Sequence, residues 1–140
     1  MKYPIGVQSF EEMRTDTWLY VDKTRYVHDL VSNGKYYFLS RPRRFGKSLL
    51  ISTLEAYFLG RRELFKGLEI DSLADDWESR PVIHIDLNAS KYTEEEDLNE
   101  LIGLQLRHME DRYGLERKGL SVASRFAQLV KAVYAQTSRK

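Results

Sequence analysis

A short basic segment contains the residues with the clearest chemical use. Gly46, Lys47 and Ser48 follow an aromatic run and precede an apolar pattern with helical spacing. In a phosphate-binding loop, N–H groups at a helix start surround phosphate oxygens, a Lys ammonium reaches the terminal phosphates and a Ser hydroxyl ligates Mg²⁺. Glycine lets the backbone approach the phosphate closely. The segment therefore predicts a nucleoside triphosphate site in which Lys47 is the leading ligand and Ser48 holds the metal.

The segment departs from the full pattern G-x-x-x-x-G-K-[ST], because Arg41 stands five residues before Gly46 where that pattern has glycine. A basic turn before a helix is the alternative interpretation. Arg41, Arg43, Arg44 and Lys47 place four positive charges in a seven-residue stretch, which indicates an anionic partner. A guanidinium can hold phosphate oxygens bidentately. For Arg43 and Arg44 individually, a solvated surface position is equally consistent with the pattern.

Composition limits the classes of protein. The 140 residues include 22 basic and 21 acidic side chains and no cysteine, and 42% are hydrophobic. This excludes disulfide scaffolds, thiolate zinc sites and globally basic nucleic-acid binders, and it favours one compact domain or part of one. No uncharged apolar run approaches the ~20 residues of a membrane span. Because Glu11 and Glu12 interrupt the start, no secretory signal is expected, and the expected location is the cytoplasm.

Periodicity and capping residues predict the elements that position the loop. Helices are expected over residues 10–14 after Ser9, from Asp22 to Asn33, over 49–58, over 98–113 after a Thr93 capping box, and from Ser121 to Tyr134, with short turns at 63–66 and 75–78.

Residues 36–39 and 82–87 are predicted to be strands, the first covered on both faces. Strands joined through helices are normally parallel, so the predicted fold class is α/β, a P-loop NTPase-like parallel sheet flanked by helices. Two strands make a poor core. Either residues 18–21 add a strand, or the chain is the N-terminal portion of a larger domain.

Three segments together resemble the AAA-ATPase-like family of bacterial and archaeal proteins: residues 3–10 (YPIGVQSF), 19–24 (LYVDKT) and 36–49 (YYFLSRPRRFGKSL). The resemblance implies that SRPRRFGKS replaces the usual loop, and that residues 1–140 are the N-terminal part of an ATPase domain. Longer members carry a C-terminal domain similar to PD-(D/E)XK nucleases. The implied cofactors are ATP and Mg²⁺, and the implied binding residues are Arg41, Pro42, Arg43, Arg44, Phe45, Gly46, Lys47, Ser48 and Leu49.

The chain offers one candidate for the acidic strand end that ATP hydrolysis requires, Asp86. No second carboxylate follows it, and in the resembling family this segment looks like the strand before the acidic one. Family members continue into a strand ending Asp-Glu, whereas this chain stops at Lys140. We therefore expect nucleotide binding with little or no hydrolysis by this chain, and Asp86 is either a metal contact or an ordinary strand-end residue.

Other polar residues have two interpretations each. Asp22 and Thr24 belong to a family signature that either approaches the nucleotide or caps a helix. His84 is expected to be a half-buried sheet residue. His28 and His108 have no partner at metal-ligand spacing and are expected on helix surfaces.

Two other functions stay open. One is a basic module for anions or nucleic acid that uses Arg41, Arg43, Arg44, Arg61 and Arg62. The other is a non-catalytic interaction fragment whose sheet edge needs the rest of the domain or a partner to cover it.

Overall fold

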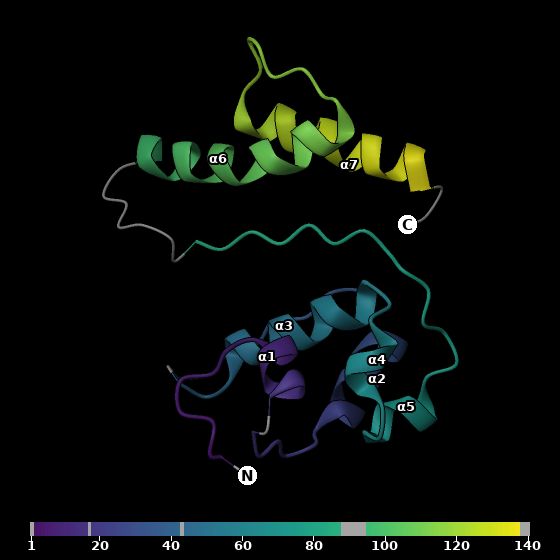
Figure 1. Ribbon diagram of the computed structural model, residues 1–140. Helices are drawn as coiled ribbons and strands as arrows, with labels where there is room; N and C mark the ends of the chain where they lie inside the picture. The colour runs from purple at the N-terminus through teal and green to yellow at the C-terminus, as the bar shows by residue number, and fades with distance from the viewer. Residues whose placement is uncertain (1, 17, 43, 88–94, 138–140) are drawn as a thin grey trace. The chain divides into compact units, whose positions relative to one another are not determined.

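The computed structural model describes residues 2–16, 18–42, 44–87 and 95–137, and the chain forms two compact units, Met1–Val82 and Ile83–Lys140 (Figure 1). The described residues form helices joined by turns and extended segments. The helices are α1 (Phe10–Thr15), α2 (Thr24–Asn33), α3 (Lys47–Phe58), α4 (Arg62–Phe65), α5 (Glu69–Leu73), α6 (Glu95–Tyr113) and α7 (Val122–Thr137).

The predicted parallel sheet is wrong, because the described residues contain no strand. Residues 36–39 belong to the first unit and residues 83–87 to the second. Tyr36 and Phe38 are 93% and 94% exposed, the opposite of a strand covered on both faces. Aromatic residues favour strands only where a neighbouring strand supplies hydrogen bonds and packing.

The additional strand considered at residues 18–21 is also absent. The structure has an isolated parallel bridge between Lys2 and Trp18, with the Leu19 amide donating to the Lys2 carbonyl at 2.8 Å. One bridge does not propagate, because the ladder needs successive paired residues on both segments.

Most of the helix predictions are confirmed. Helices lie over all five longer predicted ranges, and α4 overlaps the turn predicted at 63–66. Residues 75–78 are not helical, whereas α5 was not predicted. The Ser9 cap is confirmed, since its hydroxyl accepts from the Glu12 amide at 3.3 Å. Thr93 lies outside the described residues.

The first unit has an aromatic core that supports α3. Phe10 of α1 contacts Phe65 of α4, with ring centroids 4.7 Å apart, and Phe65 in turn packs against Tyr57 of α3. The Phe10 amide also donates to the Ser52 hydroxyl of α3 at 2.9 Å. These contacts hold the helix whose first residue is Lys47.

The second unit is a pair of helices, α6 and α7, with a small core of Leu106, Leu129 and Val133 (Figure 1). Ile83, on the extended segment that precedes α6, packs against this core. The Gln105 side chain binds the same segment, accepting from the Asp86 amide at 2.7 Å and donating to the Asp86 carbonyl. The Gln105 side chain thus pairs with the Asp86 N–H and C=O groups, which the sequence predicted would pair with a neighbouring strand. Among the described helices, none has the length and apolarity needed to cross a membrane.

Candidate phosphate-binding site

Two hydrogen bonds close the basic segment into a compact loop. The Lys47 ammonium donates to the Arg41 carbonyl at 2.9 Å, across six residues. The Arg41 guanidinium donates to the Phe45 carbonyl at 3.2 Å. The two cations therefore lie back against the loop that carries them, although both residues are exposed.

The loop backbone twice enters the left-handed region. Arg44 has φ 66° and Gly46 has φ 76°. A non-glycine residue in this region is uncommon and strained, and such residues cluster at ligand sites and turns. A Cβ at Gly46 would meet no atom within 4 Å, so within the chain glycine is required by its backbone conformation.

Helix α3 begins directly after Gly46, which is its N-cap residue, and the Leu50 amide donates to the Gly46 carbonyl at 3.0 Å. The first N–H groups of a helix have no partner one turn earlier, and the helix dipole favours an anion there. The exposed Ser48 hydroxyl belongs to this first turn. Amides, an ammonium and a hydroxyl thus come together at one helix start, which is the donor set that polyphosphate with a bound Mg²⁺ requires.

The other loop residues named from the sequence are placed as follows. Pro42, Arg44 and Phe45 are exposed, Leu49 is half-buried in α3, and Arg43 lies outside the described residues.

A cavity of about 880 Å³ adjoins the loop within the first unit. Arg41, Phe45 and Gly46 form one end of it, and α2, α3 and residues 19–21 supply most of the remaining wall. Tyrosine rings from three separate segments line it: Tyr20, Tyr26 and Tyr37. The sequence does not indicate that these tyrosines meet, because the α2 periodicity at Tyr26 is their one local signal and the three segments come together only in the folded chain.

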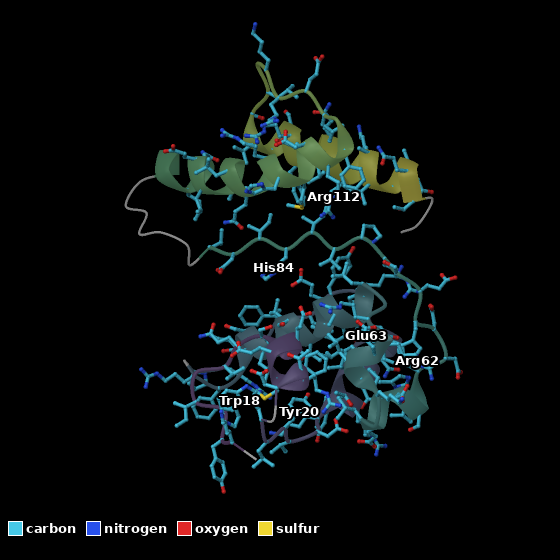
Figure 2. All side chains as sticks on the ribbon, in the orientation of Figure 1. Trp18, Tyr20, Arg62, Glu63, His84 and Arg112 are labelled. Atoms are coloured by element: carbon cyan, nitrogen blue, oxygen red, sulfur yellow. The ribbon has the colours of Figure 1, made fainter. Side chains whose placement is uncertain are left out.

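Tyr20 lies on the segment between α1 and α2 (Figure 2). Burial raises the pKa of Tyr20 to about 12, and the nearby Asp22 carboxylate adds to the effect. The phenol is therefore protonated throughout the neutral range.

The Asp22 and Thr24 side chains bind backbone amides at two helix starts, although the N-cap residues of α2 and α5 are Lys23 and Leu68. One Asp22 carboxylate oxygen accepts from the Thr24 amide at 2.9 Å and the Thr24 hydroxyl at 2.7 Å, and the other accepts from the Glu69 amide at the start of α5 at 2.7 Å. The Thr24 hydroxyl accepts from the Ile70 amide at 3.2 Å. Burial opposes ionisation of Asp22, but the hydrogen bonds from Thr24 and Glu69 outweigh it and lower its pKa. Asp22 and Thr24 therefore join α2 to α5, whereas Lys23 between them lines the cavity. An approach of this signature to the nucleotide stays a prediction.

The three histidines lie on different segments of the chain. His84 lies on the extended segment before α6 and is exposed, so the prediction of a half-buried sheet position is wrong (Figure 2). His108 is exposed on α6 as predicted, and His28 of α2 is half-buried. Within the described part of the chain, no three His, Asp or Glu residues are grouped so as to bind a metal ion. Asp86 belongs to the second unit, whereas the loop belongs to the first.

Two arginines outside the loop are engaged in ion pairs. Arg61 forms a bidentate pair with Glu11, with both N···O distances 2.7 Å, and a further pair with Glu63 at 3.1 Å. Arg62 pairs with Asp71 at 3.0 Å. These carboxylates neutralise charge that the alternative nucleic-acid module would need.

One comparison with known proteins identifies a family. The family model described as "Predicted AAA-ATPase" matches residues 4–140. A protein from Azotobacter chroococcum mcd 1, "Uncharacterized protein in vnfD 5'region", is 37% identical over 135 residues, which cover 96% of this chain and 26% of that protein. The chain thus spans about a quarter of the length of this relative. No solved structure matches.

Proposed function

Because the chain belongs to the AAA-ATPase-like family, we propose that it binds ATP with Mg²⁺ through residues 41–49. The observation that supports this most directly is the closed loop, in which the Lys47 ammonium lies 2.9 Å from the Arg41 carbonyl immediately before the α3 start. Anions bind at such positions because oriented N–H groups and a positive charge act on the same small volume.

Each loop residue has a defined part in this proposal. The Lys47 ammonium exchanges the Arg41 carbonyl for terminal phosphate oxygens, and the first-turn amides of α3 bind the neighbouring phosphate. The Ser48 hydroxyl is a ligand of the Mg²⁺ that accompanies the nucleotide. The Arg41 guanidinium, and Arg44 beside it, supply further positive charge to the phosphates.

We propose binding without appreciable hydrolysis. Among the described residues that line the cavity next to the loop, Asp29 is the one carboxylate, and it lies on α2 rather than on the loop or α3. Hydrolysis needs a carboxylate or amide side chain that orients the attacking water near the terminal phosphate. Among its described residues the loop contains no carboxylate or amide side chain, and the two that line the cavity, Asp29 and Asn33, both lie on α2.

A titration with ATP and Mg²⁺ tests the proposal. We expect Lys47→Ala to weaken ATP binding by at least ten-fold, because one charge-assisted contact is worth about 1.5–3 kcal/mol. Lys35→Ala is the matched control, since Lys35 is exposed in the same unit and does not line the cavity. Equal affinities of Lys47→Ala and the parent chain would exclude the loop, and rapid turnover abolished by Lys47→Ala would contradict binding without hydrolysis.

A further inference from the structure

The cavity next to the loop is large enough for more than phosphate. Its volume of about 880 Å³ falls within the range of small-molecule sites, about 300–1,000 Å³. Its lining is mainly apolar, and Leu30, Leu49 and Leu50 contribute to it. Phosphate is a poor occupant of such a surface, because a charge transferred to apolar surroundings loses its hydration without replacement.

One tyrosine is held in place as a wall of this cavity. The Tyr37 hydroxyl donates to the Leu30 carbonyl at 2.7 Å, which fixes the ring against the end of α2. Gly34 makes this approach possible, since a Cβ at that position would lie 2.5 Å from the Tyr37 hydroxyl oxygen. The Tyr37 ring is 56% exposed, so one part is anchored while another part is available to a ligand.

The charges around the cavity differ from one wall to another. Arg41 lies at the loop end, with the exposed Lys47 bonded to its carbonyl. The α2 wall carries Asp29 and Asn33, and the Asn33 amide donates to the Asp29 carbonyl at 3.0 Å. Lys23, the N-cap residue of α2, also lines the cavity. An anion is attracted to Arg41 and Lys23 and repelled by Asp29, whereas an uncharged ring with N–H donors is suited to the surface beside Asp29.

We propose that this cavity holds the nucleoside part of the nucleotide, with its base against Tyr37 and its phosphates on the loop. This inference rests on the proposed function and adds to it the ligand class, a nucleotide whose base contributes to affinity. An aromatic ring and a base stack through their flat faces, and such a contact supplies about a ten-fold or greater gain in affinity.

The experiment compares ATP with inorganic tripolyphosphate, each with Mg²⁺, on the full chain. Tripolyphosphate carries at least as much negative charge as ATP and lacks the nucleoside. We expect ATP to bind at least ten-fold more tightly. Tyr37→Ala should remove most of that difference while leaving the tripolyphosphate affinity unchanged, which also shows that the loop remains folded.

Tyr36→Ala is the matched control, because Tyr36 is the preceding residue, is 93% exposed and does not line the cavity. This variant should bind both ligands as the parent chain does. If ATP and tripolyphosphate bind equally, or if Tyr37→Ala retains the full preference for ATP, the nucleoside assignment is wrong although the loop still binds phosphate. If neither ligand binds, both the proposed function and this inference fail.

Discussion

At the scale of single residues, Gly46 and Asp22 have different roles. The role of Gly46 follows from its backbone conformation, and that of Asp22 follows from its hydrogen bonds. Gly46 sets the direction in which the chain enters α3, because its positive φ is disfavoured for other residues. Asp22 holds two helix starts together. Neither role can be read from residue type alone, since Asp22 and Gly46 each lie in a segment that carries the resemblance to the family.

The Gly46 conformation predicts a coupled loss of stability and binding. Gly46→Ala should lower the free energy of unfolding by about 1–2 kcal/mol, because alanine is strained at φ 76°. It should also weaken ATP binding, because relaxation of the strain opens the loop. Urea unfolding and ATP titration measure the two effects.

Gly119→Ala provides the control for Gly46→Ala, since Gly119 has the same φ of 76° and open space around its Cβ position in the second unit. It should cost similar stability and leave ATP affinity unchanged. An equal loss of ATP affinity in both variants would mean that the loop conformation does not matter for binding.

The Asp22 carboxylate predicts a pH dependence of stability. Its pKa is lowered in the folded chain from 3.8, so its stabilisation is fully present above pH 3.8 and is lost as the pH falls through its folded pKa. Asp22→Asn should therefore lower the free energy of unfolding by about 1 kcal/mol at pH 6, because asparagine has one acceptor oxygen and cannot accept from both Thr24 and Glu69. The difference from the parent chain should shrink towards pH 3.

Urea unfolding between pH 3 and pH 6 measures this effect, with the exposed Asp75→Asn as control. Asp75→Asn should change the unfolding free energy by less than about 0.5 kcal/mol, as most surface substitutions do. A difference between Asp22→Asn and the parent chain that stays constant over this pH range would show that the ionised carboxylate is not responsible.

At the scale of elements, α6 and α7 are joined by a buried ion pair as well as by leucines. Glu110 of α6 is 1% exposed and accepts two hydrogen bonds of 2.7 Å from the Arg125 guanidinium of α7. Arg125 also donates to the Gly103 carbonyl at 2.7 Å. The hydrogen bonds from Arg125 lower the pKa of Glu110 despite its burial. The pair therefore positions the two helices against each other.

Arg125→Met should destabilise the second unit by about 3 kcal/mol or more, because the buried Glu110 carboxylate loses both hydrogen bonds from Arg125 and keeps the longer ion pair with Arg117, at 3.6 Å. The double variant Glu110→Leu/Arg125→Met should recover part of this loss, since it removes the charge too. Thermal and urea unfolding followed by circular dichroism give the values. Arg112→Ala, an exposed position on α6, is the control, and a loss as large as that of Arg125→Met would contradict a specific role for the pair.

At the scale of the whole chain, the notable feature outside the two cores is an exposed apolar run at residues 36–39. Tyr36 and Phe38 are almost fully exposed, and Tyr37 and Leu39 are partly so. Contiguous exposed apolar residues favour association with other surfaces. The exposed run favours the alternative function of an interaction fragment. The ion-paired Arg61 and Arg62, in contrast, do not favour the nucleic-acid-binding alternative.

We therefore expect concentration-dependent self-association through residues 36–39. Phe38→Lys should shift the chain towards monomer in sedimentation experiments, because a charge at the centre of the run opposes contact between copies. Ile5→Lys tests whether any exposed apolar residue suffices, since Ile5 is 91% exposed outside this run. An equal shift in both variants, or none in either, would exclude residues 36–39 as the contact.

The sequence by itself determined the family, the location of the loop and the five longer helices. These depend on local signals: the motif around Lys47, the apolar spacing of each helix and caps such as Ser9. Tertiary structure alone decided that residues 36–39 and 82–87 do not form a sheet, that Asp22 joins α2 to α5, and that three distant tyrosines line one cavity. The physical reason is that a helix satisfies its backbone within one segment, whereas strand pairing, caps between helices and cavity walls depend on residues far apart along the chain.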